Sequence, residues 1–394
     1  MTRRVDLLVI GAGPAGSALA LLAARAGARV VLVERGEIPR PKVCGEFVSA
    51  EGCAVLERLG ILSALRGAGA APIDTCRLSG LRGRKLDLPL PALRHGREGI
   101  GVSRLRLDRL LAEAAASAGA ELRTGWEASE PILRDGLVRG VRARRAGRDA
   151  PPACEASVVV AADGRRSSLV RRLHPRRGDP LRTGRDAWFG LKTHLAVSGA
   201  PLARRVELHL FDGGYVGLAP VEDGRVNVCL LVRNDALRAA AGCPDRLLAR
   251  LVLESPAVRE AIGDGEVCGA WASCGPLRFG PRRPAAAGAL FLGDAAGTVD
   301  PFCGEGMSHA LLGAELALPF ALEGAARGGL GPDLARAYRG AWRRAFLPVT
   351  WRVRALGRLF GRPRAATAAL ALLRGAGRAW APRLVAATRT GWSP

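Results

Sequence analysis

Short runs of apolar residues alternate with glycine-containing turns and helix-like stretches through most of the chain. Residues 5–10 (VDLLVI) have the length and composition of a buried strand, and the small residues of 15–26 predict a helix directly after it. The apolar run at 30–33 predicts the next strand. Two later runs, within 156–172 and 287–297, each lead into a turn made of glycine and aspartate. Strands that alternate with helices in this way predict an α/β fold with a parallel sheet.

The turn after the first predicted strand has a dinucleotide-binding pattern. Gly11, Gly13 and Gly16 have the spacing G-x-G-x-x-G, which allows a tight turn, close approach of a pyrophosphate and close packing of helix on strand. Backbone N–H groups at the helix start face the phosphates in such a site. Glu34 ends the second predicted strand, where a carboxylate accepts hydrogen bonds from an adenosine ribose. The motif predicts a dinucleotide cofactor without separating NAD from FAD.

Composition and charge exclude several classes of protein. The formal net charge is +23, but lysine occurs only at Lys42, Lys85 and Lys192, and such an arginine excess is typical of GC-rich coding. Because no helix-turn-helix, zinc-finger or aromatic RNA-binding pattern accompanies the charge, we expect no nucleic-acid partner. Nine cysteines without a CxxC pair, and five histidines without ligand spacing, predict neither disulfides nor a metal site. We expect a cytoplasmic protein.

Four motifs, in this order along the chain, resemble those of one family of flavoenzymes. They are the glycine-rich turn with its Glu-Arg ending, VSRLRLDRLLAEAA, ADGRRSSLVR and GDAAGTVDPFCGEGMSHAL, spread over residues 5 to about 325. The set is similar to the FAD-dependent family that contains para-hydroxybenzoate hydroxylase, the flavin halogenases and the geranylgeranyl reductases. The resemblance implies FAD as the cofactor, with Arg104, Asp163 and Gly164 near the dinucleotide.

The same resemblance implies how the last motif meets the flavin. Asp294 holds the ribityl or pyrophosphate part, and the turn from Pro301 to Gly304 lies along the isoalloxazine ring. The N–H groups that start the helix at Glu305 point at the pyrimidine edge, where the positive end of the helix dipole stabilises the anionic reduced flavin. The expected cofactor-binding residues are Gly11, Gly13, Pro14, Ala15, Gly16, Glu34, Arg35, Cys44, Arg104, Asp163, Gly164, Gly293, Asp294, Pro301, Gly304, Glu305, Gly306 and Met307.

Several positions distinguish the branches of the family. Gly297 and Glu305 stand where aromatic hydroxylases usually have histidine and glutamine. Residues 39–49 (PRPKVCGEFVS) are similar to the segment that passes over the flavin in geranylgeranyl reductases. The halogenase signature W-x-W-x-I-P is absent. The stretch 213–221 keeps only part of the reductases' substrate signature, and we expect its Tyr215 in the substrate pocket.

Cys44 is the candidate catalytic residue. A thiol beside the flavin can donate a proton to a substrate carbon, and the alternative is a small buried side chain next to the cofactor. Glu46 and Glu305 are expected to be capping or solvated carboxylates, and His309 a packed or surface residue. Catalysis then rests on the flavin, while the protein supplies position and electrostatics.

The order of the motifs predicts how the chain divides. We expect a Rossmann-like FAD-binding domain, an inserted antiparallel β-sheet substrate domain and a cationic C-terminal helical segment, because 205–233 alternates apolar and polar positions around two glycine-containing turns. The predicted boundaries are 1–72, 99–178 and 277–328 for FAD binding, 73–98 and 179–276 for the substrate domain, and 329–394 for the C-terminal segment.

The C-terminal segment is rich in arginine and tryptophan. Val349, Val353 and Phe360 recur at helical spacing on one face, and Arg354, Arg358 and Arg362 on another. The apolar face packs on the protein in one interpretation, and the helix lies on an anionic membrane surface in the other. The tryptophans of the segment are Trp342, Trp351, Trp380 and Trp392.

These observations together predict an FAD-dependent oxidoreductase acting on an apolar organic substrate, such as a prenyl, polyketide or aromatic natural product. Reduction of a carbon–carbon double bond and hydroxylation are the two candidate reactions. The reductant is NAD(P)H or a separate electron carrier, because the sequence has no second dinucleotide motif. The alternatives are an electron-transfer flavoprotein without a small substrate and a flavin-dependent halogenase.

Overall fold

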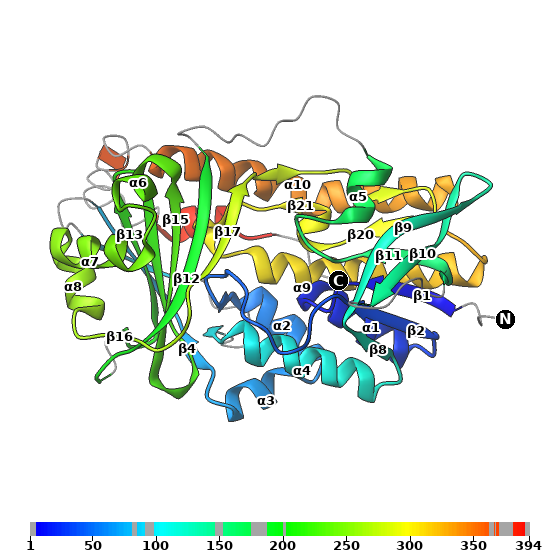
Figure 1. The fold of residues 1–394 in the computed structure, drawn as a ribbon, viewed down its shortest axis with the longest axis horizontal. Helices are drawn as coiled ribbons and strands as arrows, with labels where there is room; N and C mark the ends of the chain where they lie inside the picture. Colours follow the sequence, from blue (N-terminus) through cyan, green and yellow to red (C-terminus); the bar gives the residue numbers. More distant parts are fainter. Residues whose placement is uncertain are drawn as a thin grey trace.

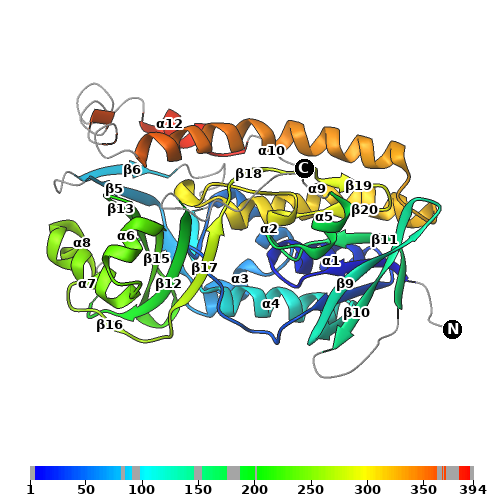
Figure 2. The ribbon, with the colours of Figure 1, turned by 45° about the horizontal axis from the view of Figure 1, so that its top comes forward.

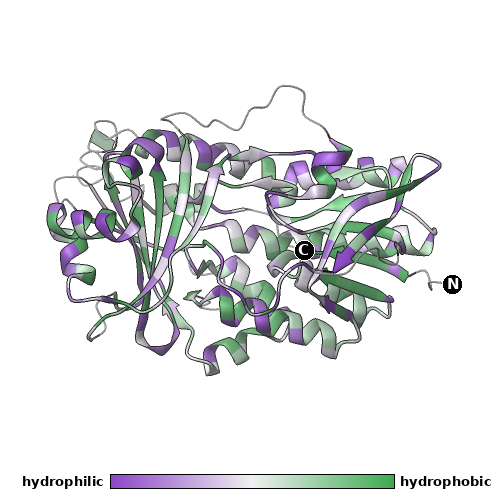
Figure 3. Ribbon diagram, viewed as in Figure 1, coloured by the Kyte–Doolittle hydropathy of each residue, from purple (hydrophilic) through white to green (hydrophobic). Residues whose placement is uncertain are grey.

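One of the two large sheets has a parallel core in the order β20-β11-β1-β2-β8, seen at the right of Figure 1. The computed structural model describes residues 5–80, 85–90, 98–145, 153–174, 187–199, 202–361, 366, 368–369 and 381–390. The predicted apolar runs form the central strands, because a strand covered on both faces is apolar along its length, and these strands are hydrophobic in Figure 3. The core strands are β1 (Val5–Ile10), β2 (Val30–Glu34), β8 (Glu121–Thr124), β11 (Ala153–Ala161) and β20 (Ala289–Phe291).

Antiparallel strands extend this sheet, and helices cover it. β19 (Ala285–Ala286) pairs with β20, and the hairpin of β9 (Trp126–Arg134) and β10 (Leu137–Arg145) pairs with β11. Helix α1 packs between α4 and α9, and its Leu19 and Leu21 are fully buried in the main core. The helices around this sheet are α1 (Pro14–Arg25), α2 (Ala50–Arg58), α3 (Leu62–Gly67), α4 (Arg104–Ser117), α5 (Ser168–Leu173) and α9 (Gly306–Ala326).

The second large sheet lies at the left of Figure 1 and is mostly antiparallel, in the order β16-β12-β15-β14-β13-β5-β6. The alternating pattern forms the hairpins expected there, since β13 pairs with β14 and β14 with β15. Helices α6 (Asn234–Ala239), α7 (Pro244–Glu254) and α8 (Pro256–Ile262) pack on it around a separate core. Its strands are β5 (Thr75–Ser79), β6 (Lys85–Pro89), β12 (Trp188–Ala196), β13 (Arg205–Phe211), β14 (Gly214–Pro220), β15 (Arg225–Arg233), β16 (Glu266–Val267) and β17 (Ala272–Leu277).

Two small sheets and three 3-10 turns connect the large sheets. One sheet joins β3 (Phe47–Val48), β7 (Gly99–Gly101) and β4 (Ala71–Ile73), and the other joins β18 (Gly280–Pro281) and β21 (Gly297–Thr298). The 3-10 turns are η1 (Glu222–Gly224), η2 (Gly293–Ala295) and η3 (Pro301–Cys303). The predicted α/β fold with an inserted antiparallel sheet and a helical C-terminal segment is confirmed.

The long helix α10 (Pro332–Phe360) runs along the outside of the molecule above α9, as Figure 2 shows in orange. Val349, Val353 and Phe360 are buried, so the predicted apolar face packs on the protein. A short helix, α12 (Ala381–Ala387), follows near the end of the chain. Three residues named for this segment, Arg362, Trp380 and Trp392, lie outside the described residues. Within the described part of the chain, no helix combines the length and hydropathy needed to cross a bilayer.

Candidate functional site

Three turns that are far apart in the sequence meet at one edge of the parallel sheet. The strands before them, β1, β11 and β20, are parallel neighbours, so their carboxyl ends lie at the same edge. A Cβ atom on Gly11 would lie 2.6 Å from the carbonyl oxygen of Ala162 and 2.7 Å from the Cα of Asp163. A Cβ on Gly293 would lie 3.3 Å from the Cβ of Ala15. The fold therefore brings the first turn, the Asp163–Gly164 turn and the Gly293–Asp294 turn together.

Two cations lie over the first turn. A Cβ on Gly13 would lie 3.5 Å from Nζ of Lys42 and 3.7 Å from a guanidinium nitrogen of Arg104. Asp108 holds both cations, with Lys42 at 3.0 Å and Arg104 at 2.8 Å. Burial and the neighbouring Arg104 charge lower the pKa of Lys42. The sequence motifs placed Arg104 here but missed Lys42 and Asp108, although Lys42 belongs to the quoted KVCG segment.

Glu34 is nearly inaccessible at the end of β2, with 4% of its surface exposed. Its Oε2 accepts a hydrogen bond from the N–H of Ala12 at 3.0 Å, and its Oε1 accepts one from Arg40 at 2.8 Å. Burial alone would raise the pKa of Glu34, but the charges of Lys42 and Arg40 outweigh it and the pKa is lowered. The carboxylate therefore stays ionised beside the glycine turn, while the next residue, Arg35, is exposed.

Two aspartates of the predicted site lie in desolvated positions. Oδ1 of Asp163 is buried and has no hydrogen-bond partner among the described residues, and burial raises the pKa of this carboxyl. Asp294 keeps part of its surface exposed, but the surrounding protein desolvates its carboxyl group and raises its pKa. The charges of Arg165, Arg104 and Arg282 oppose this shift. An acceptor oxygen buried without a partner fits a site that a donor group of a ligand completes.

The turn of DPFCGEGM has the strained backbone that its glycines imply. Gly304 has φ of +68°, and a Cβ there would lie 2.8 Å from the ring of Phe47. Gly306 starts helix α9, and Met307 is buried in the main core. Pro301 begins the 3-10 turn η3 and is exposed. The close approach at Gly304 is made by a side chain of β3, so the turn is packed against this small sheet.

Glu305 differs from its expectation as a capping or solvated carboxylate. It is fully buried at the start of α9, its side chain makes no capping hydrogen bond, and it forms an ion pair with Arg389. The guanidinium of Arg389 is also buried and lies 5.8 Å from the centroid of the Phe47 ring. The end of the chain therefore packs against the turn that the motif predicts beside the flavin. No sequence pattern indicated this contact.

Cys44 lies half-buried between the two large sheets. Its sulfur accepts a hydrogen bond from the N–H of Glu46 at 3.4 Å, and its carbonyl accepts one from Asn227 of β15 at 3.1 Å. Burial raises the pKa of the Cys44 thiol, although the nearby Arg104 charge opposes the shift. The thiol is therefore protonated at neutral pH and has a proton to donate.

Glu46 joins this segment to the second sheet. Its Oε1 accepts hydrogen bonds from Lys192 at 2.6 Å and from the N–H of Arg104 at 2.8 Å, and its Oε2 lies 2.6 Å from Nε2 of His194. The expectation of a capping carboxylate is confirmed by the contact with the first turn of α4. The alternative of a solvated carboxylate is wrong, because Glu46 is fully buried. Lys192 and His194 on β12 were missed by the sequence motifs.

Tyr215, on β14 of the second large sheet, contacts the DPFCGEGM turn. Its ring packs edge-on against Phe302 with centroids 5.7 Å apart, and Phe302 stacks on Phe360 of α10 at 5.0 Å. The Tyr215 hydroxyl is buried with no partner among the described residues, and burial raises its pKa well above the ordinary value. The predicted substrate-pocket residue therefore lies beside the turn predicted to contact the flavin.

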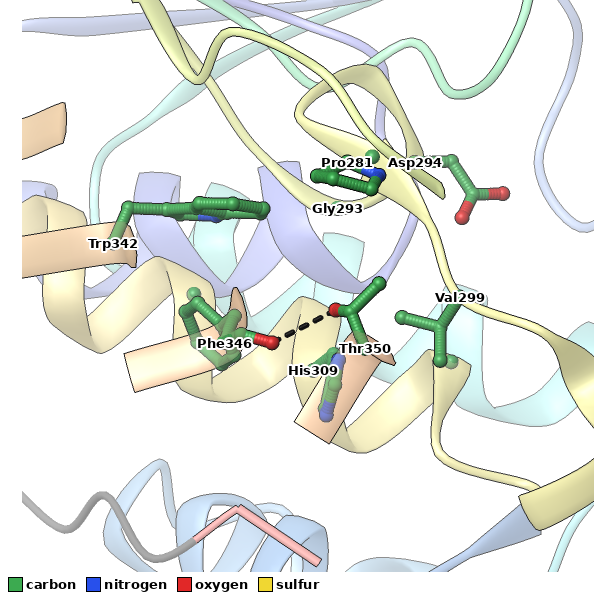
Figure 4. A pocket seen from close by; sticks show the side chains of 11 residues that line it. Pro281, Gly293, Asp294, Val299, His309, Trp342, Phe346 and Thr350 are labelled. Carbon is green, nitrogen blue, oxygen red and sulfur yellow. Dashed lines mark hydrogen bonds between the residues drawn. The ribbon is translucent and has the colours of Figure 1, made fainter. Parts of the chain in front are cut away.

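A hollow lies between α9 and α10 (Figure 4). Gly293, Asp294 and Gly306 line one part of it, and the side chains of Trp342 and Phe346 from α10 line another. His309 lines this hollow and is buried, so the expectation of a packed residue holds. Burial lowers the pKa of His309 to about 4 and keeps the ring neutral. Figure 4 shows the Asp294 carboxylate pointing away from the aromatic side chains.

Comparisons with known proteins identify the family. The FAD binding domain family matches residues 4–339. The chain is 30% identical over 357 residues to digeranylgeranylglycerophospholipid reductase 2 of Methanopyrus kandleri, covering 86% of this chain and 83% of that protein. It is 30% identical over 347 residues to menaquinone reductase of Mycolicibacterium smegmatis, covering 79% and 75%.

A solved structure supports the fold assignment. The geranylgeranyl bacteriochlorophyll reductase-like protein of Thermoplasma acidophilum superposes with a TM-score of 0.75 at 22% identity, covering 98% of this chain and 92% of that one. The resemblance inferred from the motifs is therefore confirmed. The chain belongs to the FAD binding domain family and is an FAD-dependent oxidoreductase.

Proposed function

We propose that this flavoenzyme reduces carbon–carbon double bonds in the prenyl chain of a lipid. The observation that carries the proposal is the place of Cys44, half-buried in the KVCGE segment between the two sheets, where burial raises the pKa of its thiol. A relative of 30% identity along most of the chain is named for reduction of a digeranylgeranyl lipid. Hydroxylation needs no thiol proton, so a proton donor of this kind at the sheet interface favours reduction.

The residues at the sheet edge fit FAD. Gly13 leaves room for a pyrophosphate under the cations of Lys42 and Arg104, and Glu34 accepts hydrogen bonds as a ribose partner does. Asp163 offers a buried oxygen without a partner. We therefore propose that FAD is bound by Lys42 together with the residues expected from the sequence, which are Gly11, Gly13, Pro14, Ala15, Gly16, Glu34, Arg35, Cys44, Arg104, Asp163, Gly164, Gly293, Asp294, Pro301, Gly304, Glu305, Gly306 and Met307.

Reduced FAD, when bound, supplies a hydride to one carbon of the double bond. The Cys44 thiol donates the proton to the other carbon and regains one from solvent, so the substrate gains two hydrogens in total. Tyr215, Phe302 and Phe360 form an apolar wall that excludes water from the double bond. The reductant for bound FAD would be NAD(P)H or a separate electron carrier, and the absence of a second dinucleotide motif leaves both open.

We place the substrate pocket between two domains, with FAD bound by 1–72, 99–178 and 277–328 and the substrate sheet formed by 73–98 and 179–276. Ligands commonly bind at such junctions. The remaining part, 329–394, forms the C-terminal helical segment, through which we propose that the protein meets a lipid substrate at a membrane surface.

The test is reduction of a geranylgeranyl lipid by the purified protein loaded with FAD and reduced under anaerobic conditions. We expect the flavin to be reoxidised by the lipid, and mass spectrometry to show two added hydrogens per reduced double bond. Cys44→Ser should slow this reoxidation by about 100-fold in protein that is saturated with FAD, so that any change in FAD affinity does not enter the measured rate. The matched control is Cys154→Ser, since burial also raises the pKa of Cys154. Substrate-dependent oxygen uptake with a hydroxylated product would overturn the proposal.

A further inference from the structure

Helix α10 has one buried and one outward face along its 29 residues. At about 1.5 Å per residue it is about 43 Å long, and it forms the outer edge of the molecule in Figure 2. The buried face contains Tyr338, Trp342, Phe346, Val349 and Val353. The outward face, called the α10 surface below, consists of the exposed residues Arg336, Arg343, Arg344, Trp351, Arg352, Arg358 and Leu359.

Few acidic side chains compensate the positive charge of the α10 surface. The helix has seven arginines and a single acidic residue, Asp333, which lies in its first turn and pairs with Arg327. None of the five arginines of the α10 surface forms an ion pair with another described residue. Some exposed arginines elsewhere do so, for example Arg58 with Glu315 at 2.7 Å. A GC-rich coding bias adds arginines everywhere but does not explain why acids are missing here.

Large apolar side chains interrupt this cationic surface. Trp351 is 50% exposed and Leu359 is 40% exposed, although both are large enough to favour burial. The guanidinium of Arg354 lies 5.4 Å from the centroid of the Trp351 ring. In a bilayer interface, arginines interact with anionic headgroups, while tryptophan and leucine lie at the boundary with the acyl chains. The α10 surface has side chains of both kinds next to each other.

We propose that the α10 surface docks on an anionic lipid bilayer, with the helix lying in the plane of the interface. Arginines near an anionic leaflet attract its headgroups, and an interfacial helix inserts its apolar side chains only to the acyl boundary. A nucleic acid also attracts arginines, but Trp351 and Leu359 add nothing to phosphate contacts along a duplex. The charge pattern together with the apolar residues therefore favours the membrane.

Docking through this surface would bring the candidate site to the membrane. Gly357 of α10 packs directly against the carboxylate of Asp300, the first residue of the DPFCGEGM turn. Phe360, one position after the exposed Leu359, stacks on Phe302, which in turn contacts Tyr215. The inference that the substrate enters from the bilayer rests on the proposed function. The docking itself does not, because it depends only on the outward residues of α10.

The test is co-sedimentation of the full FAD-loaded protein with vesicles of phosphatidylcholine, with and without phosphatidylglycerol. We expect binding only to the anionic vesicles, weakened by salt. Two variants with the same loss of charge are compared. The α10 variant carries Arg343→Gln, Arg344→Gln, Arg352→Gln and Arg358→Gln, and the control carries Arg66→Gln, Arg145→Gln, Arg238→Gln and Arg246→Gln at other exposed sites.

The α10 variant should lose affinity for anionic vesicles by at least about tenfold, while the control stays close to the parent. Brominated lipid should quench tryptophan fluorescence of the parent, and Trp351→Phe should remove most of this quenching. Equal loss in both variants, equal binding to neutral vesicles, or tighter binding of an RNA oligonucleotide through α10 would overturn the proposal. Vesicle binding without lipid reduction would instead contradict only the proposed function.

Discussion

Nζ of Lys192 lies 2.6 Å from Oε1 of Glu46, and both side chains are almost completely buried. The pair ties β12 of the second sheet to the segment that carries Cys44. His194 binds the other oxygen of the same carboxylate. A charge network at this position holds the Cys44 thiol at a constant place relative to both sheets.

Glu46→Gln should lower the free energy of unfolding by about 3–5 kcal/mol, because it leaves Lys192 as a buried charge without its counterion. The matched control is Glu260→Gln, which removes an exposed partner of Lys85 and should cost at most about 1 kcal/mol. Urea denaturation of both variants measures the difference. Equal costs would mean that the buried network adds little to stability.

Glu46 should also make stability depend on acid pH. Burial would raise its pKa, but the hydrogen bonds and charges of His194 and Lys192 outweigh this and lower it from 4.5. A carboxyl group whose pKa is lower in the folded protein stabilises the fold at pH values above its pKa in the unfolded chain. This stabilisation is lost as the pH falls through the pKa in the folded protein. Denaturation of the parent below about pH 4.5 should therefore show a steep loss of stability that Glu46→Gln lacks.

Gly11→Ala should destabilise the fold and abolish FAD binding, since its Cβ would lie 2.6 Å from the Ala162 carbonyl oxygen. Gly119→Ala is the matched control, because Gly119 has φ of +103° beside +102° at Gly11 but no atom within 4 Å of its Cβ position. The control should cost only the backbone strain of about 1–2 kcal/mol. Thermal unfolding and FAD fluorescence quenching measure both effects. A Gly11→Ala protein that binds FAD normally would contradict the placement of the pyrophosphate.

Arg104→Gln should weaken FAD binding by about 10- to 100-fold, because one charged contact near the pyrophosphate is lost. The exposed Arg109 of the same helix pairs only with Glu113 at 3.7 Å, so Arg109→Gln serves as the control and should leave FAD affinity unchanged. Titration calorimetry of the apoproteins with FAD measures both affinities. The same loss in the control would show that general charge, and not the cation over Gly13, attracts the cofactor.

Asp300 should make stability fall as pH rises through mild acid. Burial raises its pKa from 3.8 to about 6, with the charges of Arg354 and Arg358 opposing the shift. Because the folded protein binds this proton more tightly than the unfolded chain, stability decreases as pH rises from about 4 to 6. Asp300→Asn should remove that decrease. Asp212→Asn, at a side chain that is 76% exposed, should leave the pH profile of unfolding unchanged.

The local sequence determined the strands, the turns and the presence of a dinucleotide-binding site. Apolar runs, the spacing of Gly11, Gly13 and Gly16, and the acidic end of β2 act within one strand–turn–helix unit, where neighbours in sequence are neighbours in space. The same locality explains the hairpins of β13, β14 and β15, whose register follows from their turns.

Only the tertiary structure decided which charged groups share a site. Glu46 and Lys192 lie 146 positions apart, and Glu305 meets Arg389 from the end of the chain. A charge pattern along the sequence does not distinguish a solvated carboxylate from a buried one, because burial depends on how distant elements pack. For this reason the sequence indicated only solvated or capping carboxylates, whereas the packing of two sheets and a terminal segment buries Glu46 and Glu305 in ion pairs. Of the two, only Glu46 also makes the expected capping contact, with the N–H of Arg104.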